Sequence, residues 1–456
     1  MKHLTPQIIA DITGGEYIGG TNSRNSGITG AVRDNRDVKP GNLFVCITGV
    51  RADGHSFANS AFDSGAACCL AEKTIPDAKG PYVHVKSTLE SIKTIAKYYR
   101  NLFDIPIIGI TGSVGKTTAK ELIAAALGEK LIVLKTLENM NNELGVPLTL
   151  LSLSEQHEAA VIEMGIDHFG EMSRLADMVR PDILVMTKIG YSHINTLGGL
   201  DGVLQAKSEV FNFMKPGGVA ILSGDDKMLR EYAPGMRKIT FGIEEGNDFR
   251  AVNIVAEGTL SVKCDITSGT GQFSIKIPSY GSHLALLAPA AAAVGRLLGL
   301  TDEEVSRGLL TYSPASGRAN VIDTDSITII DDCYNANPHS VNEALTSLSG
   351  LPGRRVAILG DMYNLGELSH EQHREAGFTA VRCGVECLVC CGDEAMSIYE
   401  GYISAGGKEA YHYRNNEELI IALPKIIKKH DVVLIKASHG MRFDEVLPSL
   451  RSLDYK

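Results

Sequence analysis

The sequence predicts an α/β protein of three domains: a small N-terminal α/β module, a central phosphate-loop domain with a mostly parallel sheet, and a C-terminal Rossmann-like domain. Three observations support this prediction. The 456-residue chain is long for one core. Buried-strand patterns alternate with helical patterns from residue 105 onward, and turn residues cluster at 312–317 before the alternation restarts. The expected domains are residues 1–103, 104–314 and 315–456.

The N-terminal module differs from the rest of the chain in its residue composition and in the length of its strand patterns. Its short strand patterns are separated by many Gly, Asp and Asn residues, and it closes with a helical pattern over 89–103. A strand pattern that begins at 105–106 and runs from 107 into the following glycine loop then opens the central domain.

A glycine loop follows the first strand pattern of the central domain. It reads Thr111-Gly-Ser-Val-Gly-Lys-Thr-Thr118, and apolar residues at helical spacing follow it up to Gly128. Such a loop lets backbone N–H groups approach phosphates, while its lysine reaches the β and γ oxygens and its threonine hydroxyl coordinates magnesium. The strict motif needs glycine where this chain has Ile110, so the strand–loop–helix context favours a phosphate site over a plain glycine turn. The predicted ATP contacts here are Gly112, Ser113, Val114, Gly115, Lys116, Thr117 and Thr118.

Further strands are expected along both larger domains. In the central domain they lie at 159–164, 183–187 and 219–222, followed by an antiparallel addition over 250–277 and a helix over 285–298. In the C-terminal domain they lie at 327–330, 355–359, 386–390 and 432–435. Regular alternation of strands with helices indicates parallel, covered sheets.

Polar residues follow two of the central strands. Glu163 ends one strand, and His193 follows the next, at the edge where α/β sheets gather ligands. Lys207 lies on a later helical stretch. Each also has an ordinary alternative: a solvent-facing carboxylate, a loop histidine and a solvated helix face.

Composition excludes some classes of function. The net charge of −10 argues against a general nucleic-acid or membrane-surface binder, so an anionic ligand must be held by local groups. Neither an apolar N-terminal segment nor a run of about 18 apolar residues is present, so we expect a cytoplasmic protein without membrane insertion. The odd count of nine cysteines suits a reducing compartment. The cluster at 383–391 reads as a buried strand rather than a zinc site.

Several segments together resemble the Mur ligases of peptidoglycan synthesis. They are 33–36, 40–44, 53–55, 111–118, 139–149, 163–165, His193, 206–209, 332–338, 359–362 and 366–367. The resemblance spans nearly the whole chain. Within the family, Tyr334-Asn-Ala-Asn-Pro338 is similar to the type that adds a dipeptide, whereas sister ligases and folylpolyglutamate synthases carry a histidine in this motif.

The resemblance implies a reaction. ATP would phosphorylate the terminal carboxylate of UDP-N-acetylmuramoyl-tripeptide (UDP-MurNAc-tripeptide), and D-alanyl-D-alanine (D-Ala-D-Ala) would attack the acyl phosphate to give the UDP-MurNAc-pentapeptide, ADP and phosphate. It further implies ATP and two Mg²⁺ ions as cofactors, small-molecule partners only, a monomer, and a role in cell-wall biogenesis, cell shape and division. The alternatives are a sister or folylpolyglutamate-type ligase that adds one amino acid, and a nucleotide-binding switch.

The resemblance also implies roles for individual residues. The catalytic residues would be Lys116, Lys207, His193 and Arg318. The metal ligands would be Thr117, Glu163, His193 and Lys207 as a carbamate. Further ATP contacts would be His283, Arg318, Asp332 and Asn335. Substrate contacts would be Arg36, Asp53, His55, Asn139, Asn142, Tyr334, Asn337 and Lys436.

The chain departs from the family pattern at three places. His283 is followed by Leu284 and Leu287 where the family has asparagines, which leaves the adenine contacts open. His439 stands where the family has an arginine, and Asn35 where it commonly has a serine. For Arg318, at the second domain boundary, a linker arginine in a surface ion pair is the alternative.

Overall fold

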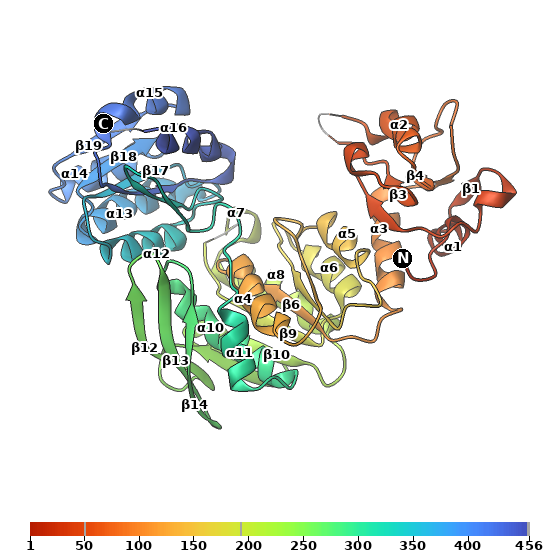
Figure 1. Ribbon diagram of the computed structural model, residues 1–456, viewed down its shortest axis with the longest axis horizontal. Helices are drawn as coiled ribbons and strands as arrows, with labels where there is room; N and C mark the ends of the chain where they lie inside the picture. The colour runs from red at the N-terminus through yellow and green to blue at the C-terminus, as the bar shows by residue number, and fades with distance from the viewer. Residues whose placement is uncertain (50–51, 192–193, 454–456) are drawn as a thin grey trace. The chain divides into compact units, whose positions relative to one another are not determined.

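The computed structural model describes residues 1–49, 52–191 and 194–453. It is an α/β protein with N-terminal, central and C-terminal sheets, as predicted (Figure 1). The chain divides into two compact units. Unit 1 is Met1–Ile110, Leu131–Leu184 and Ser208–Gly218, and unit 2 is Thr111–Lys130, Val185–Lys207 and Val219–Lys456. Segments of the central domain thus belong to both units.

The N-terminal module in unit 1 is built on a sheet of order β1-β5-β4-β3-β2, in which only β1 is antiparallel. Its core includes the buried residues Phe44, Cys46 and Cys69. The predicted helix is confirmed as α3, which Ser87 caps. The elements are α1 (Pro6–Thr13), β1 (Glu16–Ile18), η1 (Thr21–Ser23), β2 (Gly30–Val32), η2 (Asn35–Asp37), β3 (Asn42–Val45), η3 (Gly54–Phe57), α2 (Ala58–Asp63), β4 (Cys68–Ala71), β5 (Tyr82–His84) and α3 (Thr88–Arg100).

Unit 1 also holds central strands in the parallel order β6-β8-β7. Every residue of β6 and β8 is buried, as expected for parallel strands covered on both faces. The elements are β6 (Ile107–Thr111), β7 (Val133–Lys135), α5 (Gly145–Leu150), β8 (Ala159–Glu163), α6 (Glu171–Val179), β9 (Ile183–Met186) and η4 (Glu209–Phe213).

In unit 2, the central strands run in the order β14-β13-β12-β11-β10. Strands β10 to β12 are parallel, and β12 to β14 form the predicted antiparallel addition. The predicted helix after them is α10, which begins two residues early at His283. The elements are α4 (Lys116–Gly128), α7 (Ile194–Leu197), α8 (Leu200–Ser208), β10 (Val219–Ser223), α9 (Lys227–Glu231), β11 (Arg237–Gly242), β12 (Phe249–Glu257), β13 (Ser261–Ser268), β14 (Gly271–Ile277), α10 (His283–Leu297) and α11 (Asp302–Leu309).

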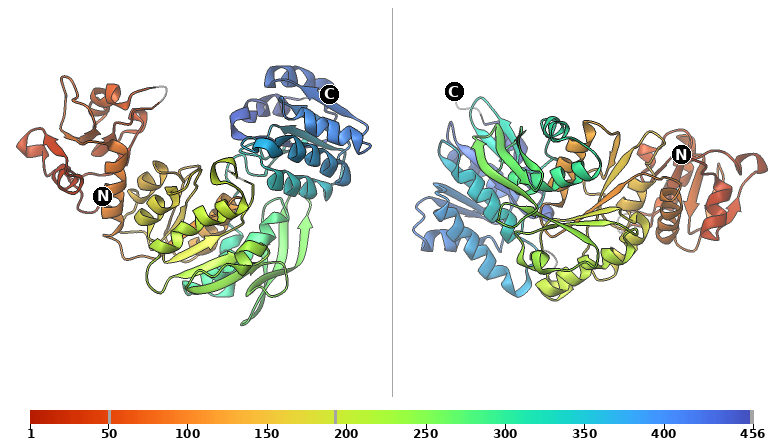
Figure 2. Two further views of the ribbon diagram at one scale, coloured as in Figure 1. Left: turned by 180° about the vertical axis from the view of Figure 1, so that it is seen from behind. Right: turned by 90° about the horizontal axis from the view of Figure 1, so that it is seen from below.

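The C-terminal sheet, also in unit 2, has the order β15-β16-β20-β17-β18-β19, with only β15 antiparallel. Alternate residues of β17 pack into two cores: Ala357 and Leu359 into one, Val356 and Ile358 into the other. Figures 1 and 2 show the helices on both faces. The elements are β15 (Asn320–Asp323), β16 (Thr328–Asp331), α12 (Pro338–Ser349), β17 (Arg355–Gly360), η5 (Gly366–Leu368), α13 (Ser369–Arg382), β18 (Cys387–Cys391), α14 (Met396–Ser404), β19 (Ala410–Tyr413), α15 (Asn416–Ile426), β20 (Val432–Lys436), η6 (His439–Met441), η7 (Phe443–Glu445) and α16 (Leu447–Arg451).

Within the described residues, no helix combines the length and apolar character needed to cross a membrane. The cysteine-rich strand prediction is confirmed, because Cys387, Cys390 and Cys391 are buried in β18 as free thiols.

Candidate active site

The glycine loop connects β6 to α4 as predicted. Gly112 has φ +143°, and a Cβ there would collide with Thr187 Oγ1, so only glycine fits this close approach. Lys116 opens α4, and its Nζ donates to Gly112 O at 2.8 Å across the loop. Thr117 is buried on the same turn. The lysine and the helix N-terminus therefore lie on one short loop, the arrangement that holds phosphate groups.

The segment after β9 supports this loop. Ser113 Oγ donates to Gly190 O at 3.1 Å, and Thr187 Oγ1 donates to Val114 O at 2.5 Å. Asp226 Oδ2 accepts the Ile189 N–H at 2.9 Å. Thr187 and Asp226 were not predicted as part of the site, since neither belongs to the phosphate-loop motif.

Glu163 is a buried carboxylate, so the solvent-facing alternative is wrong. Its side chain is at the carboxyl end of β8 and the residue is 1% exposed. Asn141 Nδ2 donates to Glu163 Oε1 at 2.8 Å, and the Glu163 N–H donates to Thr136 Oγ1 at 3.0 Å. This carboxylate is therefore held in a fixed place.

Asn141, which contacts Glu163, was not among the residues chosen from the sequence. The prediction chose its neighbours Asn139, which is exposed, and Asn142, whose Oδ1 accepts the N–H groups of Leu144 and Gly145 at the start of α5. The three asparagines stand in one run, and only the fold shows which of them contacts Glu163.

Lys207 is 2% exposed on α8, so the solvated-face alternative is wrong for it. The nearby Glu209 caps α6, where its carboxylate accepts the N–H groups of Gly170 and Ser173, each at 3.0 Å. His193 lies outside the described residues. Among the residues described, no three His, Cys, Asp or Glu side chains form a metal-binding group.

Most of the predicted C-terminal residues gather around Asp332. Lys436 Nζ donates to Asp332 Oδ2 at 2.6 Å and to Asn335 O at 2.9 Å, while Asp332 Oδ1 accepts the Ala319 N–H at 3.2 Å. Lys436 is 3% exposed. This buried ion pair joins the strand end of β20 to the segment after β16.

An aromatic stack lies beside that ion pair. The Arg318 guanidinium lies 4.0 Å from the Tyr334 ring centroid, and the His439 ring centroid lies 5.4 Å from it. Arg318 therefore makes a cation–π contact rather than the surface ion pair of the alternative reading. Asn337 accepts the Ser340 N–H as the cap of α12, so its predicted substrate role would be shared with a structural one.

His283 is the first residue of α10, and the charges of Asp332 and Lys436 act on its imidazole. Burial lowers the pKa of its imidazole, while the charges of Glu343 and Asp332 raise it and that of Lys436 lowers it. His283 is therefore neutral at pH 7 and lies within electrostatic reach of the Asp332–Lys436 pair.

The predicted substrate residues of the N-terminal module form two ion-pair clusters. Arg36 Nε donates to Asp34 Oδ1 at 2.9 Å, and this contact lowers the pKa of Asp34 to about 2. Asp53 Oδ2 accepts from Lys73 and Asp53 Oδ1 pairs with His55 Nδ1, both at 2.6 Å. The hydrogen bonds from Lys73 and then His55 lower the pKa of Asp53.

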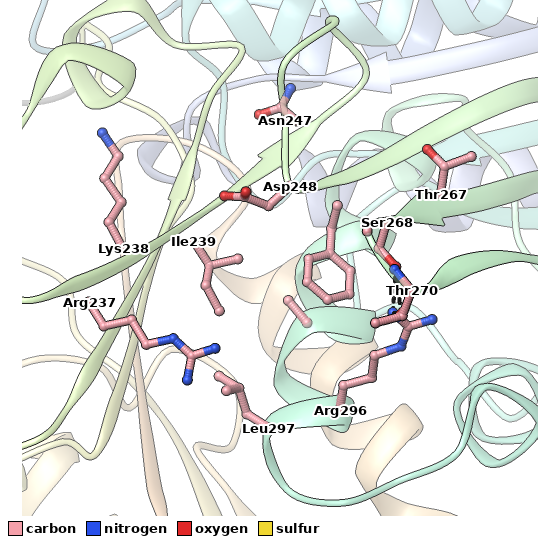
Figure 3. Close-up of a pocket in the computed structure, with 13 residues that line it drawn as sticks. Arg237, Lys238, Ile239, Asn247, Asp248, Thr267, Ser268, Thr270, Arg296 and Leu297 are labelled. Atoms are coloured by element: carbon pink, nitrogen blue, oxygen red, sulfur yellow. Dashed lines mark hydrogen bonds between the residues drawn. The ribbon is translucent and has the colours of Figure 1, made fainter.

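A cavity of about 680 Å³ lies apart from all the predicted residues, between β11, β12, the β13–β14 turn and α10 (Figure 3). Arg296 in its wall pairs with Asp302 at 2.7 Å and donates to the Ser268 hydroxyl. Lys238 donates to three backbone carbonyls at the end of α9. These two cations are thus engaged in holding the wall.

Family models match three stretches of the chain. They describe the Mur ligase family catalytic domain at residues 28–100, the Mur ligase middle domain at 110–295 and the Mur ligase glutamate ligase domain at 317–439. Among curated proteins, the UDP-N-acetylmuramoyl-tripeptide--D-alanyl-D-alanine ligase of Bacillus subtilis is 34% identical, with 93% of each chain covered. The Escherichia coli protein of the same name is 32% identical over 99% of each chain.

Solved structures agree. MurF from Acinetobacter baumannii superposes with a TM-score of 0.87 at 29% identity over 98% of both chains. MurF ligase from Thermotoga maritima in complex with ADP has a TM-score of 0.81 at 30% identity and covers 92% of this chain and 97% of its own. The chain belongs to the Mur ligase family.

Proposed function

We propose that this protein is an ATP-dependent ligase that joins D-Ala-D-Ala to UDP-MurNAc-tripeptide in peptidoglycan synthesis. The observation that carries the proposal is end-to-end similarity to two curated ligases of that specificity. The phosphate loop and the Tyr334–Pro338 motif support it. Residues 1–103 would bind the UDP-linked substrate, 104–314 would bind ATP, and 315–456 would close on ATP and the dipeptide.

The reaction has two steps. A carboxylate oxygen of the tripeptide attacks the γ-phosphorus, and the bond to the β–γ bridging oxygen breaks, which gives an acyl phosphate and ADP. The neutral dipeptide amine then attacks the acyl carbon, and the tetrahedral intermediate releases one amine proton to solvent and expels inorganic phosphate as the amide forms. An α-amino group with a pKa near ~8 is already neutral in a minority of molecules at pH 7, so the required nucleophile is present without a dedicated base.

Cationic groups meet the main requirement of the first step, which brings two anions together. Lys116, whose Nζ lies over the loop at 2.8 Å from Gly112 O, would contact the β and γ phosphates. Arg318 would contact the γ-phosphate from the C-terminal domain, and Asp332, Asn335 and His283 would contact the nucleotide.

Magnesium is expected as the second cofactor, with two ions. The chemistry of the donors fits, because Thr117 and Glu163 offer hard oxygen atoms, and the Glu163 carboxylate is buried and held by Asn141. Bound Mg²⁺ would neutralise phosphate charge. As an ammonium the buried Lys207 repels cations, and as a carbamate it would become an anionic ligand together with His193. A native Lys207 peptide without the added mass of CO₂ would contradict the carbamate.

The substrate contacts proposed for the UDP-linked peptide are Arg36, Asp53, His55, Asn139 and Asn142. Tyr334, Asn337 and Lys436 are proposed for the dipeptide. A monomer acting in the cytoplasm, where ATP is supplied, completes the proposal.

The test is a phosphate-release assay with paired substrates. We expect release only when ATP, UDP-MurNAc-tripeptide and D-Ala-D-Ala are all present. Release with a single amino acid in place of the dipeptide would indicate a sister ligase. Slow ATP hydrolysis that ignores both peptide substrates would indicate a nucleotide switch.

A pair of lysine variants sharpens this assay. Lys116→Ala should lower turnover by about 10²-fold or more, because one charged contact to the phosphates is lost. Lys227→Ala is the matched control, since the side chain of the exposed Lys227 on α9 makes no hydrogen bond or ion pair among the described residues.

A further inference from the structure

The main chain at Lys188 forms part of the support of the phosphate loop. The Lys188 carbonyl oxygen accepts the Ser113 N–H at 2.7 Å, directly after Thr187, which binds Val114 O. Two consecutive loop residues are therefore held by the segment that carries Lys188. A displacement of this segment would therefore move Ser113 and Val114 of the loop through these two hydrogen bonds.

The Lys188 side chain extends from this segment to the first turn of α12. Its Nζ lies 3.0 Å from Nε2 and 3.3 Å from Nδ1 of His339. One helical turn further on, Glu343 Oε1 lies 3.0 Å from His339 Nε2. Residues four apart share a helix face, so lysine, imidazole and carboxylate form one continuous chain of contacts.

The charges along this chain of contacts are balanced. Burial by itself would raise the pKa of Glu343, but the hydrogen bond from His339 and the charge of Lys188 help to hold this pKa below its ordinary value. Glu343 is thus an anion at neutral pH. Because this carboxylate can only accept, His339 Nε2 donates to it, and Nδ1 is the ring nitrogen that accepts from Lys188 at 3.3 Å. The side chains of His339 and Glu343 are 30% and 26% exposed.

The position of α12 fixes the position of the segment that directly precedes it in the chain. The helix begins at Pro338, and the segment immediately before it holds Tyr334 and Asn337, the proposed dipeptide contacts. A link from the phosphate-loop support to the first turn of α12 therefore sets the dipeptide segment relative to the phosphate loop.

We propose that Lys188 and His339 are positioning residues that hold the dipeptide-binding segment in register with the phosphate loop. This inference rests on the proposed ligase function. It assigns them no contact with the reacting atoms: they act through Ser113 on one side and through the start of α12 on the other.

The test is a double-mutant cycle on the full-length protein with Lys188→Met, His339→Gln and the double variant. We expect each single variant to raise the KM for D-Ala-D-Ala or lower kcat by about tenfold, while the KM for ATP changes less than twofold. The double variant should be no worse than the more affected single variant, because the two side chains act as one unit. Lys188→Arg, which keeps a donor for the imidazole, should restore most of the activity.

Thermal unfolding of the same variants separates positioning from simple stabilisation, and Lys227→Met serves as the control on an exposed lysine. Additive kinetic effects, or variants that lose stability while kcat and both KM values stay unchanged, would overturn the inference. A wild-type protein that is inactive with the paired substrates would overturn the proposed function and this inference with it. A wild-type protein that is active beside unaffected variants would overturn only the inference.

Discussion

Asp53, a predicted substrate contact, also makes hydrogen bonds within the protein that order its own loop. Its carboxylate accepts hydrogen bonds from Lys73 and from the backbone N–H of His55, and it pairs with the His55 ring. The other ring nitrogen of His55, Nε2, accepts the Glu72 N–H at 2.9 Å. The ring hydrogen therefore lies on Nδ1, which donates a hydrogen bond to Asp53 Oδ1. Asp53 therefore orders the loop that leads into η3.

This arrangement predicts a pH dependence of stability. The folded pKa of Asp53 lies below its unfolded value of about 3.9, so its stabilising contribution is present above that pH and is lost as pH falls through the folded pKa. We expect Asp53→Asn to lower the free energy of unfolding at neutral pH and to converge with wild type at low pH in urea titrations. Asp77→Asn, an exposed change in the same module, is the control; an equal difference at all pH values would contradict the prediction.

At the scale of elements, the phosphate loop depends on how closely α11 approaches α4. A Cβ at Gly308 of α11 would lie 2.6 Å from the carbonyl oxygens of Ala125 and Ala126 on α4. Thr301 and Glu304 form a capping box at the start of α11, which fixes its entry. The helix that carries Lys116 is thus packed against a backbone surface that tolerates only glycine at this point.

Gly308→Ala should therefore destabilise the protein by about 1–3 kcal/mol through overpacking. Gly128→Ala, at the exposed end of α4 with open space where a Cβ would lie, should instead be neutral or stabilising by up to about 1 kcal/mol. Thermal unfolding of the two variants measures whether each change in the free energy of unfolding has the expected sign. A Gly308→Ala protein as stable as wild type would show that α11 moves away at little cost.

At the scale of the whole molecule, the net charge of −10 opposes the binding of a polyanionic nucleotide. Binding must come from local groups such as Lys116 and the helix N-terminus behind the loop. A ligand bound only by the folded state stabilises that state by mass action.

We therefore expect MgATP at about 100 times its Kd to stabilise the wild-type protein by about 2.7 kcal/mol, seen as a rise in Tm. Lys116→Ala should lose most of this rise at the same nucleotide concentration, while the Lys227→Ala control keeps it. An unchanged rise in the Lys116 variant would place the main nucleotide contact elsewhere.

The order of elements and the phosphate loop could be predicted from the sequence because both are written in local patterns. Strand and helix periods span a few residues, and the loop from Thr111 to Thr118 is one contiguous segment. The strands β6, β8, β10 and β17 were found close to their predicted positions for this reason. The burial of Glu163 and Lys207 was not decided by local pattern, since polar side chains at strand ends and on helices are exposed in most proteins.

The sequence by itself thus determined the three-domain α/β class, the triphosphate loop and the resemblance to the Mur ligases. Only the tertiary structure decided that Asn141 rather than its neighbours contacts Glu163, that Arg318 stacks on Tyr334, and that Lys188 reaches His339. The last two residues are 151 positions apart in the chain. Their contact arises from the packing of whole elements, and packing depends on distant surfaces that no local window of sequence contains.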